Sequence, residues 1–468
     1  MKRDGCFITI RRGSSTCSRR GSQAEQALRS ARYGCWYAPR FARLIAMMRK
    51  GGFTALRSSV LPVDCPPARV VFAFALLMVS STGNTAGRPP VSAAAPIAQL
   101  TLDWPALAER VVQHLALVPG ERVLSLCAGD RFQREFEPHL RYAVMKAGGV
   151  DLGCLEVLAE PLPQAFDPQV IQRGTSPARE ALRGVLRDVD AAVMLAGAAP
   201  KHPAYAALQD LLRQGNSARR TVHFHWEGGG QPSAVAIAGQ PLPPQHLIDA
   251  VYQRAVLRED CAAIGAAQRR VEAALRRGEV RVKTPLGTDL RFRVGDRPMN
   301  LQDGDASAAR ARTAKVLVDR EVELPCGVLR VAPLEESVSG IIAYPVTQWD
   351  GRPVEGLKLH FEKGRVTRIE AAAGREAVEA ALRSGGPGSE AFREFALGFN
   401  PELAVPERNP WIPYYGYGSG VVRLALGDNT ELGGNVTSGR PRWWDLFVDT
   451  TVSVGDTVLV RSGKLTGP

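Results

Sequence analysis

Between residues 104 and 226, short apolar runs of strand length alternate with longer segments whose apolar residues recur at helical spacing. The apolar runs are residues 122–127, 153–158, 190–195 and 220–226, and the helical segments are residues 103–117, 135–147, 176–186 and 205–214. Strands that alternate with helices at this interval are typical of βαβ units on a mostly parallel sheet. The pattern therefore predicts an α/β domain, which we place at residues 97–250.

The second half of the chain has a different character. Residues 247–277 show one long helical pattern, of which we assign 251–277 as a connecting helix. Residues 280–294 alternate around a Pro-Leu-Gly-Thr turn, which indicates a hairpin. Further short strand-like runs follow, with one helical segment at residues 375–383. We therefore expect an α+β domain at residues 278–468.

The net charge of +12 does not describe the predicted domains. Residues 1–95 carry 15 Lys and Arg against 3 Asp and Glu, whereas the rest of the chain balances at 44 of each. A basic nucleic-acid surface is therefore not indicated for the folded part. The first domain contains neither a GxGxxG motif nor a P-loop, so the sequence does not imply a bound nucleotide.

Residues 1–96 have the composition of a tail, rich in Arg, Ser and Gly without a sustained period, and we expect them to be disordered or removed. Within this tail, residues 69–95 combine a basic start, about ten apolar residues and a run of small residues, as in a secretory signal peptide. The apolar run is too short to span a bilayer. If residues 69–95 are a signal peptide, the protein is periplasmic or secreted, with an internal start near Met47 or Met48; if the tail is a meaningless extension, the protein is cytoplasmic.

Four of the eight cysteines lie in the predicted domains: Cys127, Cys154, Cys261 and Cys326. Their spacing contains no CxxC pair and no zinc-type pattern. Most stand in apolar surroundings, so we expect buried free thiols.

Five short motifs of the second half resemble those of one enzyme family. They are residues 285–290 (PLGTDL), 325–340 (PCGVLRVAPLEESVSG), 361–366 (FEKGRV), 393–400 (REFALGFN) and 424–427 (LALG). In order and spacing they resemble the metal-dependent aminopeptidases of the aminopeptidase T type, whose motifs include GTDL, GEVFTAPxEDSxxG and HIALG. The resemblance implies the fold of that family. It also implies a hydrolase in which carboxylates and histidines of the C-terminal domain hold two divalent ions (zinc, cobalt or manganese).

The resemblance also shows where the implied metal ligands have changed. Val328 stands at the position of a family glutamate, and Arg423 and Trp443 stand at the positions of two family histidines. Glu394 and Asp445 remain as candidate catalytic or metal-ligating residues. A guanidinium offers only donors, so Arg423 cannot ligate a cation and would favour a carboxylate or phosphate. Where Glu394 and Asp445 lie close to Arg423, they are its ion-pair partners.

A second resemblance involves residues 427–434 (GDNTELGG). They are similar to a stretch of the 2,5-dihydroxypyridine ring-cleaving dioxygenases, which hold one Fe(II) with a 2-His-1-carboxylate triad. This resemblance would place the two histidines at Glu394 and Trp443, so that only Asp445 fits it. All seven histidines lie at or before His360, so the later residues contain none.

Aromatic residues and glycines gather between residues 409 and 434, where they could line a ligand pocket or form a packed surface loop. The candidate ligand-binding residues are Arg423, Tyr414, Tyr415, Tyr417, Glu431 and Trp443. His223 and His225 lie two apart on a predicted strand, so they share a face that could bind a metal or simply form a polar strand surface.

Three hypotheses follow. The first is an aminopeptidase T-like protein with a degenerate metal site, without a cofactor, that binds a small anionic or peptide-like ligand. The second is an active leucyl-type aminopeptidase in which Glu431, Glu394 and Asp445 serve as substitute ligands for a divalent metal. The third is a non-enzymatic homodimer or interaction protein that uses the aromatic loop around Tyr414 and Tyr417 as its interface. None of the three predicts a nucleic-acid partner or a transmembrane span in the mature domain.

Overall fold

The computed structural model describes residues 101–157, 163–175, 177–198, 202–214, 217–228, 232–237, 239–442 and 445–466. The predicted tail with its signal-peptide-like segment and the candidate residue Trp443 lie outside this part of the chain. Within it, no helix combines the length and the apolar character needed to cross a membrane.

The first five-stranded sheet is parallel throughout. Its order is β2 (Val150–Glu156), β1 (Arg122–Cys127), β3 (Ala191–Met194), β4 (Arg220–Phe224) and β9 (Glu321–Leu324). Each adjacent pair of strands runs in the same direction. The predicted parallel sheet is confirmed, but its edge strand β9 comes from within the residues that we assigned to the second domain.

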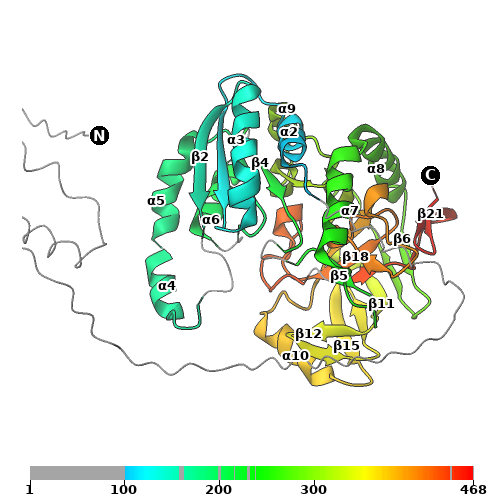
Figure 1. The fold of residues 1–468 in the computed structure, drawn as a ribbon. Coiled ribbons are helices and arrows are strands. Elements are labelled where there is room, and N and C mark those ends of the chain that lie inside the picture. The colour runs from blue at the N-terminus through cyan, green and yellow to red at the C-terminus, as the bar shows by residue number, and fades with distance from the viewer. Residues whose placement is uncertain are drawn as a thin grey trace, which may run out of the picture. The chain divides into compact units, whose positions relative to one another are not determined.

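Helices cover both faces of this sheet (Figure 1). Because successive strand residues point to opposite faces, Val123 joins one core and Leu124 the other. The first core includes α2 (Trp104–Leu115) and α3 (Glu137–Lys146), and the second includes α6 (Pro203–Arg213). Two further helices, α4 (Pro168–Thr175) and α5 (Ala178–Val185), follow β2 in the chain.

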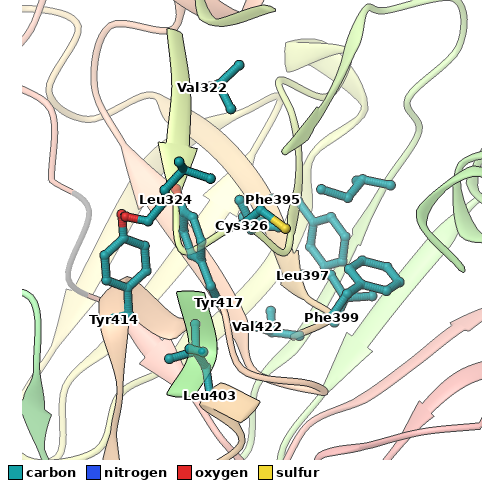
Figure 2. Packing of buried hydrophobic residues seen from close by; sticks show 14 of the residues in the cluster. Val322, Leu324, Cys326, Phe395, Leu397, Phe399, Leu403, Tyr414, Tyr417 and Val422 are labelled. Carbon is teal, nitrogen blue, oxygen red and sulfur yellow. The ribbon is translucent and has the colours of Figure 1, made fainter. Parts of the chain in front are cut away.

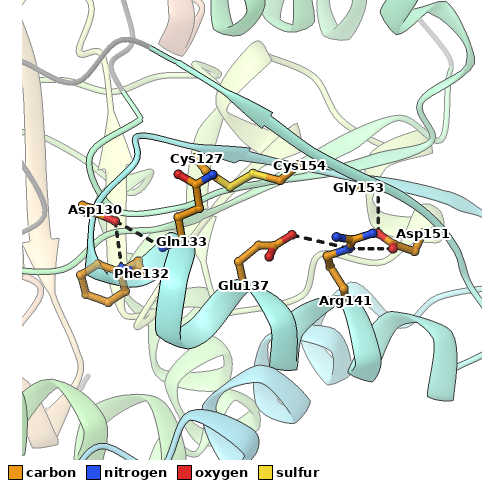
Figure 3. Close-up of a disulfide and its surroundings, with 9 residues drawn as sticks. All are labelled: Cys127, Asp130, Phe132, Gln133, Glu137, Arg141, Asp151, Gly153 and Cys154. Carbon is orange, nitrogen blue, oxygen red and sulfur yellow. Dashed lines mark hydrogen bonds and ion pairs between the residues drawn. A yellow bond between two sulfur atoms is a disulfide. The ribbon is translucent and has the colours of Figure 1, made fainter. Parts of the chain in front are cut away.

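Cys127 and Cys154 form a disulfide between the neighbouring strands β1 and β2 (Figure 3). The expectation of free thiols is wrong for this pair. The two residues are 27 positions apart in sequence, but the pairing of β1 with β2 brings their Cα atoms to 6.4 Å. Cys261 and Cys326 are free.

The predicted helix over residues 247–277 is two helices, α7 (Gln245–Arg258) and α8 (Cys261–Leu275). The break falls at Glu259 and Asp260. The side chain of Asp260 accepts a hydrogen bond from the backbone N–H of Ala263 and so caps α8, which favours a new helix start over a continuous helix. Glu259 is buried at this break.

The C-terminal half contains antiparallel sheets, as expected. A five-stranded sheet has the order β19 (Leu446–Phe447), β18 (Val422–Leu426), β16 (Phe392–Gly398), β10 (Val328–Val331) and β8 (Met299–Gln302). An eight-stranded sheet has the order β15 (Arg365–Glu370), β14 (Lys358–Glu362), β11 (Ser339–Ala343), β7 (Asp289–Phe292), β6 (Val280–Lys283), β20 (Thr451–Val454), β21 (Thr457–Arg461) and β22 (Lys464–Leu465). The remaining elements are the pairs β12 (Thr347–Trp349) with β13 (Arg352–Val354) and β5 (Val235–Ala236) with β17 (Trp411–Ile412), and the helices α9 (Ala308–Arg312) and α10 (Arg375–Ser384). The predicted hairpin is β6–β7 and the predicted helix is α10.

One hydrophobic core runs through both halves of the described chain. Figure 2 shows part of it, with Leu324 of β9 next to Tyr414 and Tyr417 from the C-terminal half. The two halves therefore share buried surface and are not independent modules.

Candidate functional site

Three neighbouring antiparallel strands place charged residues on one sheet face. Arg330 of β10 and Arg423 of β18 both pair with Ala396 of β16. Glu394 lies two residues before Ala396, and side chains two residues apart on a strand share a face. The register of the sheet therefore brings Arg330, Glu394 and Arg423 together.

Glu394 is fully buried and bonded by guanidinium groups. Arg330 donates from Nε to Oε1 at 2.9 Å and from Nη2 to Oε2 at 3.0 Å, while Arg423 donates from Nη2 to Oε1 at 2.6 Å. The Nε of Arg393 lies 3.6 Å from Oε2. Burial alone would raise the pKa of Glu394, but the three arginines outweigh it and hold that pKa well below its usual value.

Glu431 completes this arrangement from the turn Thr430–Leu432. It accepts a hydrogen bond from Nη2 of Arg330 at 2.9 Å and another from Arg393. Arg393 reaches it from a bulge in β16, where the register with β18 shifts between Phe392 and Glu394. We call Arg330, Arg393, Glu394, Arg423 and Glu431 the arginine–glutamate cluster.

Asp445 is not part of this cluster. Its carboxylate is buried and bonds Arg442, with an Nη2–Oδ1 distance of 2.9 Å. Burial raises the pKa of Asp445, against the influence of Arg442. The guanidinium of Arg442 in turn lies 4.0 Å from the ring centroid of Trp349. The structure therefore brings Glu394, Arg423 and Glu431 together and gives Asp445 a different partner.

The aromatic residues of the candidate loop lie in the interior. Tyr414 and Tyr417 are 0% and 1% exposed. The hydroxyl of Tyr414 donates to the carbonyl of Leu324 at 2.8 Å, and that of Tyr417 donates to Glu323. Tyr414 and Tyr417 therefore cannot form the interface that the interaction hypothesis placed at these two residues.

Tyr415 is half-buried and faces the end of the parallel sheet. Its ring centroid lies 5.5 Å from that of His225, which in turn lies 5.6 Å from that of His223. Burial lowers the pKa of both histidines, which favours their neutral form. Among the described residues, neither belongs to a group of three side chains close enough to hold a metal ion.

A cavity of about 810 Å³ lies next to Asp445, which forms part of its wall. Its lining includes Tyr344, Trp349, Arg440, Arg442, Asp445 and Phe447. Tyr344 and Trp349 are 4% and 2% exposed, and neither the hydroxyl nor the indole N–H finds a hydrogen-bond partner in the protein. Such buried donors are costly unless a bound molecule or water accepts from them.

The comparisons with known proteins concern the fold. Residues 262–404 match the model of the thermophilic metalloprotease (M29) family. The solved structure of wild-type AmpT from Thermus thermophilus, an aminopeptidase T, superposes with a TM-score of 0.52 at 17% identity and covers 78% of this chain and 98% of that one. The chain has the aminopeptidase T-like fold.

This aminopeptidase T-like chain matches no curated protein. A branched-chain amino acid ABC transporter from Thermus thermophilus with bound valine aligns over 36% of this chain and 48% of that one, at 16% identity. Its TM-score of 0.18 is too low to indicate a shared fold. The stretch that matches the family includes Arg330, Arg393 and Glu394 and ends before Arg423.

Sequence reasoning missed two residues of the cluster, Arg330 and Arg393. A signal for Arg330 was available, because it is a charged residue inside an otherwise apolar strand, two positions after Val328. No comparable signal exists for Arg393, because its contact with Glu431 depends on the bulge in β16.

Proposed function

We propose that this aminopeptidase T-like protein has a degenerate metal site and binds a small anionic or peptide-like ligand without standard two-metal peptidase catalysis. The observation that carries the proposal is the state of Glu394. Guanidinium groups of Arg330 and Arg423 bond the carboxylate that the family resemblance assigns to the metals.

The donor chemistry of the cluster does not suit a pair of divalent ions. A two-metal centre needs several anionic or imidazole ligands around shared space. Here Arg330, Arg393 and Arg423 approach Glu394, and a guanidinium has no lone pair to offer. Val328, at the position of a family glutamate, is a buried apolar side chain. A cation that bound Glu394 would have to displace hydrogen bonds from Arg330 and Arg423. It would also be repelled by the positive charges of these guanidinium groups.

The cavity of about 810 Å³ is the better place for the ligand. Arg423, which the sequence suggested, already bonds Glu394, whereas Arg440 lines the cavity with a guanidinium side chain that is 54% exposed. A carboxylate or a peptide carbonyl accepts from such donors. The indole of Trp349 and the apolar part of the wall suit an amino-acid side chain.

Two measurements test the proposal. Purified protein supplied with zinc, cobalt or manganese is expected to release no amino acid from dipeptides or aminoacyl anilides. Dipeptide binding, measured by calorimetry, is expected to weaken in Arg440→Gln, which removes a charged donor from the cavity wall, and to stay unchanged in the exposed control Arg375→Gln, which lies outside that wall. Metal-dependent amino-acid release that disappears in Glu394→Gln would overturn the proposal.

The active-enzyme alternative makes a distinct prediction. If Glu431, Glu394 and Asp445 were substitute ligands, Asp445→Ala would abolish metal uptake. Its bond to Arg442 and its separation from the cluster lead us to expect no such loss.

A further inference from the structure

A second group of polar side chains lies where α2, the α7–α8 break and the segment after β9 meet. His114 is near the end of α2, Glu259 and Cys261 flank the break, and Cys326 follows β9. One ligand atom from each of His114, Glu259 and Cys261 lies within 4.8 Å of the others. Among the described residues, this is the one such group of His, Cys, Asp and Glu, and all three of its members precede the family match at 262–404.

The hydrogen bonds of His114 leave one ring nitrogen open. Its Nδ1 lies 2.7 Å from the backbone carbonyl of Gly304, which can only accept, so Nδ1 carries the proton in the neutral ring. The lone pair of Nε2 then points away from that bond. A histidine held in this way by a carbonyl is oriented as metal-ligating histidines are.

Glu259 is oriented in the same manner. Its Oε2 accepts from the backbone N–H of Cys326 at 2.8 Å, while its Oε1 faces Nε2 of His114 at 3.1 Å. Neither Nε2 nor Oε1 makes a hydrogen bond of acceptable geometry, although His114 and Glu259 are only 8% and 4% exposed. These two buried atoms form an ion pair with each other whose geometry falls short of a hydrogen bond, and a cation between them would replace that contact.

Two sulfur atoms complete the surroundings. The Sγ atoms of Cys261 and Cys326 are 3.6 Å apart, a spacing compatible with two thiolates on one tetrahedral ion at about 2.3 Å from each. Gly304 has a φ of +83°, and a Cβ there would lie 2.9 Å from Sγ of Cys261 and 3.0 Å from the His114 ring. Only glycine allows the backbone to approach this closely.

We propose that His114, Glu259 and Cys261 bind one zinc-type divalent cation, and that Cys326, whose Sγ lies near that of Cys261 but outside this group of three, becomes the fourth ligand by a change in its side-chain position. A nitrogen, an oxygen and two sulfurs are a donor set that zinc accepts in tetrahedral sites. A cavity of about 300 Å³, lined in part by His114, Cys261 and Asp303, gives the ion a path from solvent.

The role of this cation is structural. It joins the first helix of the parallel-sheet half to the connecting helices and to the loop that enters β10. Four protein ligands leave no open position for a substrate, which is the pattern of structural zinc sites. The site is separate from the arginine–glutamate cluster, so it holds whether or not the proposed function does.

Cobalt titration of reduced, chelator-treated protein tests the site. We expect one Co²⁺ per chain with a thiolate-to-cobalt charge-transfer band. Cys261→Ser is expected to lose most of that band, His114→Ala and Glu259→Gln to bind at least about 100-fold more weakly, and Cys326→Ser to lose part of the band with about 10-fold weaker binding. The exposed control His139→Ala should match the parent protein. Circular dichroism of each variant shows that it is folded.

Three outcomes would overturn the site. They are absence of the band in the reduced parent protein, a full band in folded Cys261→Ser, and a Cys261–Cys326 disulfide in protein that still holds its metal. Cobalt bound at the carboxylates of the arginine–glutamate cluster would give no sulfur band. A failure of the proposed function is therefore distinguishable from a failure of this site.

Discussion

The arginine–glutamate cluster and the group around His114 treat a buried carboxylate in opposite ways. Glu394 accepts bonds from two guanidinium groups and has a third 3.6 Å away. Glu259 bonds one backbone N–H through Oε2 and leaves Oε1 facing an imidazole nitrogen without a satisfied bond. At Glu394 the partners are arginine guanidinium groups, whereas at Glu259 the partner of Oε1 is the imidazole of His114, whose Nε2 lies 3.1 Å away.

The proposed cation site does not lie where the family resemblance places the metals. The family resemblance points to the antiparallel sheet, yet the donor atoms that could hold an ion lie at the break between α7 and α8. Where a cation can bind depends on which side chains offer lone pairs and on how those lone pairs are oriented.

The largest expected effect on stability comes from removing the charge of Glu394. Glu394→Gln keeps the shape but leaves Arg423 buried without its counter-charge and Arg330 with Glu431 alone, so we expect a loss of about 3–5 kcal/mol in the free energy of unfolding. Urea denaturation measures it. The control Glu379→Gln disrupts an i,i+4 pair on the surface and should change stability by less than about 1 kcal/mol. Equal effects of the two changes would contradict the description of the cluster.

Removing the cation tests the other side of the comparison. At a free zinc concentration 100 times the dissociation constant, chelation should lower the stability of the parent protein by about 2.7 kcal/mol. In Cys261→Ser, chelation should have little effect. Thermal unfolding with and without chelator is the measurement, and an equal response of both proteins would count against the site.

A third carboxylate sharpens the contrast through pH. Glu321 is buried and bonds the amide of Gln209 at 2.9 Å, with no guanidinium bonded to it. Burial raises its pKa to about 8. The folded state therefore holds a proton that the unfolded state has lost between about pH 4.5 and 8, and stability declines as pH rises through this window. Glu321→Gln should remove about 3.5 kcal/mol of that decline in unfolding curves at pH 5 and pH 8. An unchanged decline would mean that other groups cause it.

The smallest expected effect concerns the large cavity. Arg440→Gln removes a half-exposed guanidinium from the cavity wall, so dipeptide binding should weaken by about 1 kcal/mol, or roughly fivefold, with little change in stability. Calorimetry measures both, and unchanged binding would place the ligand elsewhere.

The sequence predicted the features that depend on local periodicity. The parallel strands, the β6–β7 hairpin and α10 follow from apolar spacing and turn residues. The motifs of the second half pointed to the aminopeptidase T-like fold, and the pairing of Glu394 with Arg423 was foreseen as one possibility.

The remaining features depend on contacts between distant residues. The Cys127–Cys154 disulfide follows from the pairing of β1 with β2, which no local pattern encodes. The group of His114, Glu259 and Cys261 spans nearly 150 positions and has no spacing motif. Nothing in the sequence pattern marks Glu259, because it lies in a stretch that reads as one continuous helix. In the structure, Asp260 caps a new helix directly after it.

Strand β9 comes about a hundred residues after β4 in the chain, and this affects how the protein folds during synthesis. The hydrogen bonds of β4 on its outer side are met by residues 321–324. On the ribosome, the amino-terminal sheet must wait for about a hundred further residues before that edge is covered, and until then β4 is open to pairing with another chain. A fragment that stops near residue 277 should therefore aggregate, and trigger-factor-like chaperones should hold the nascent chain longest over this interval.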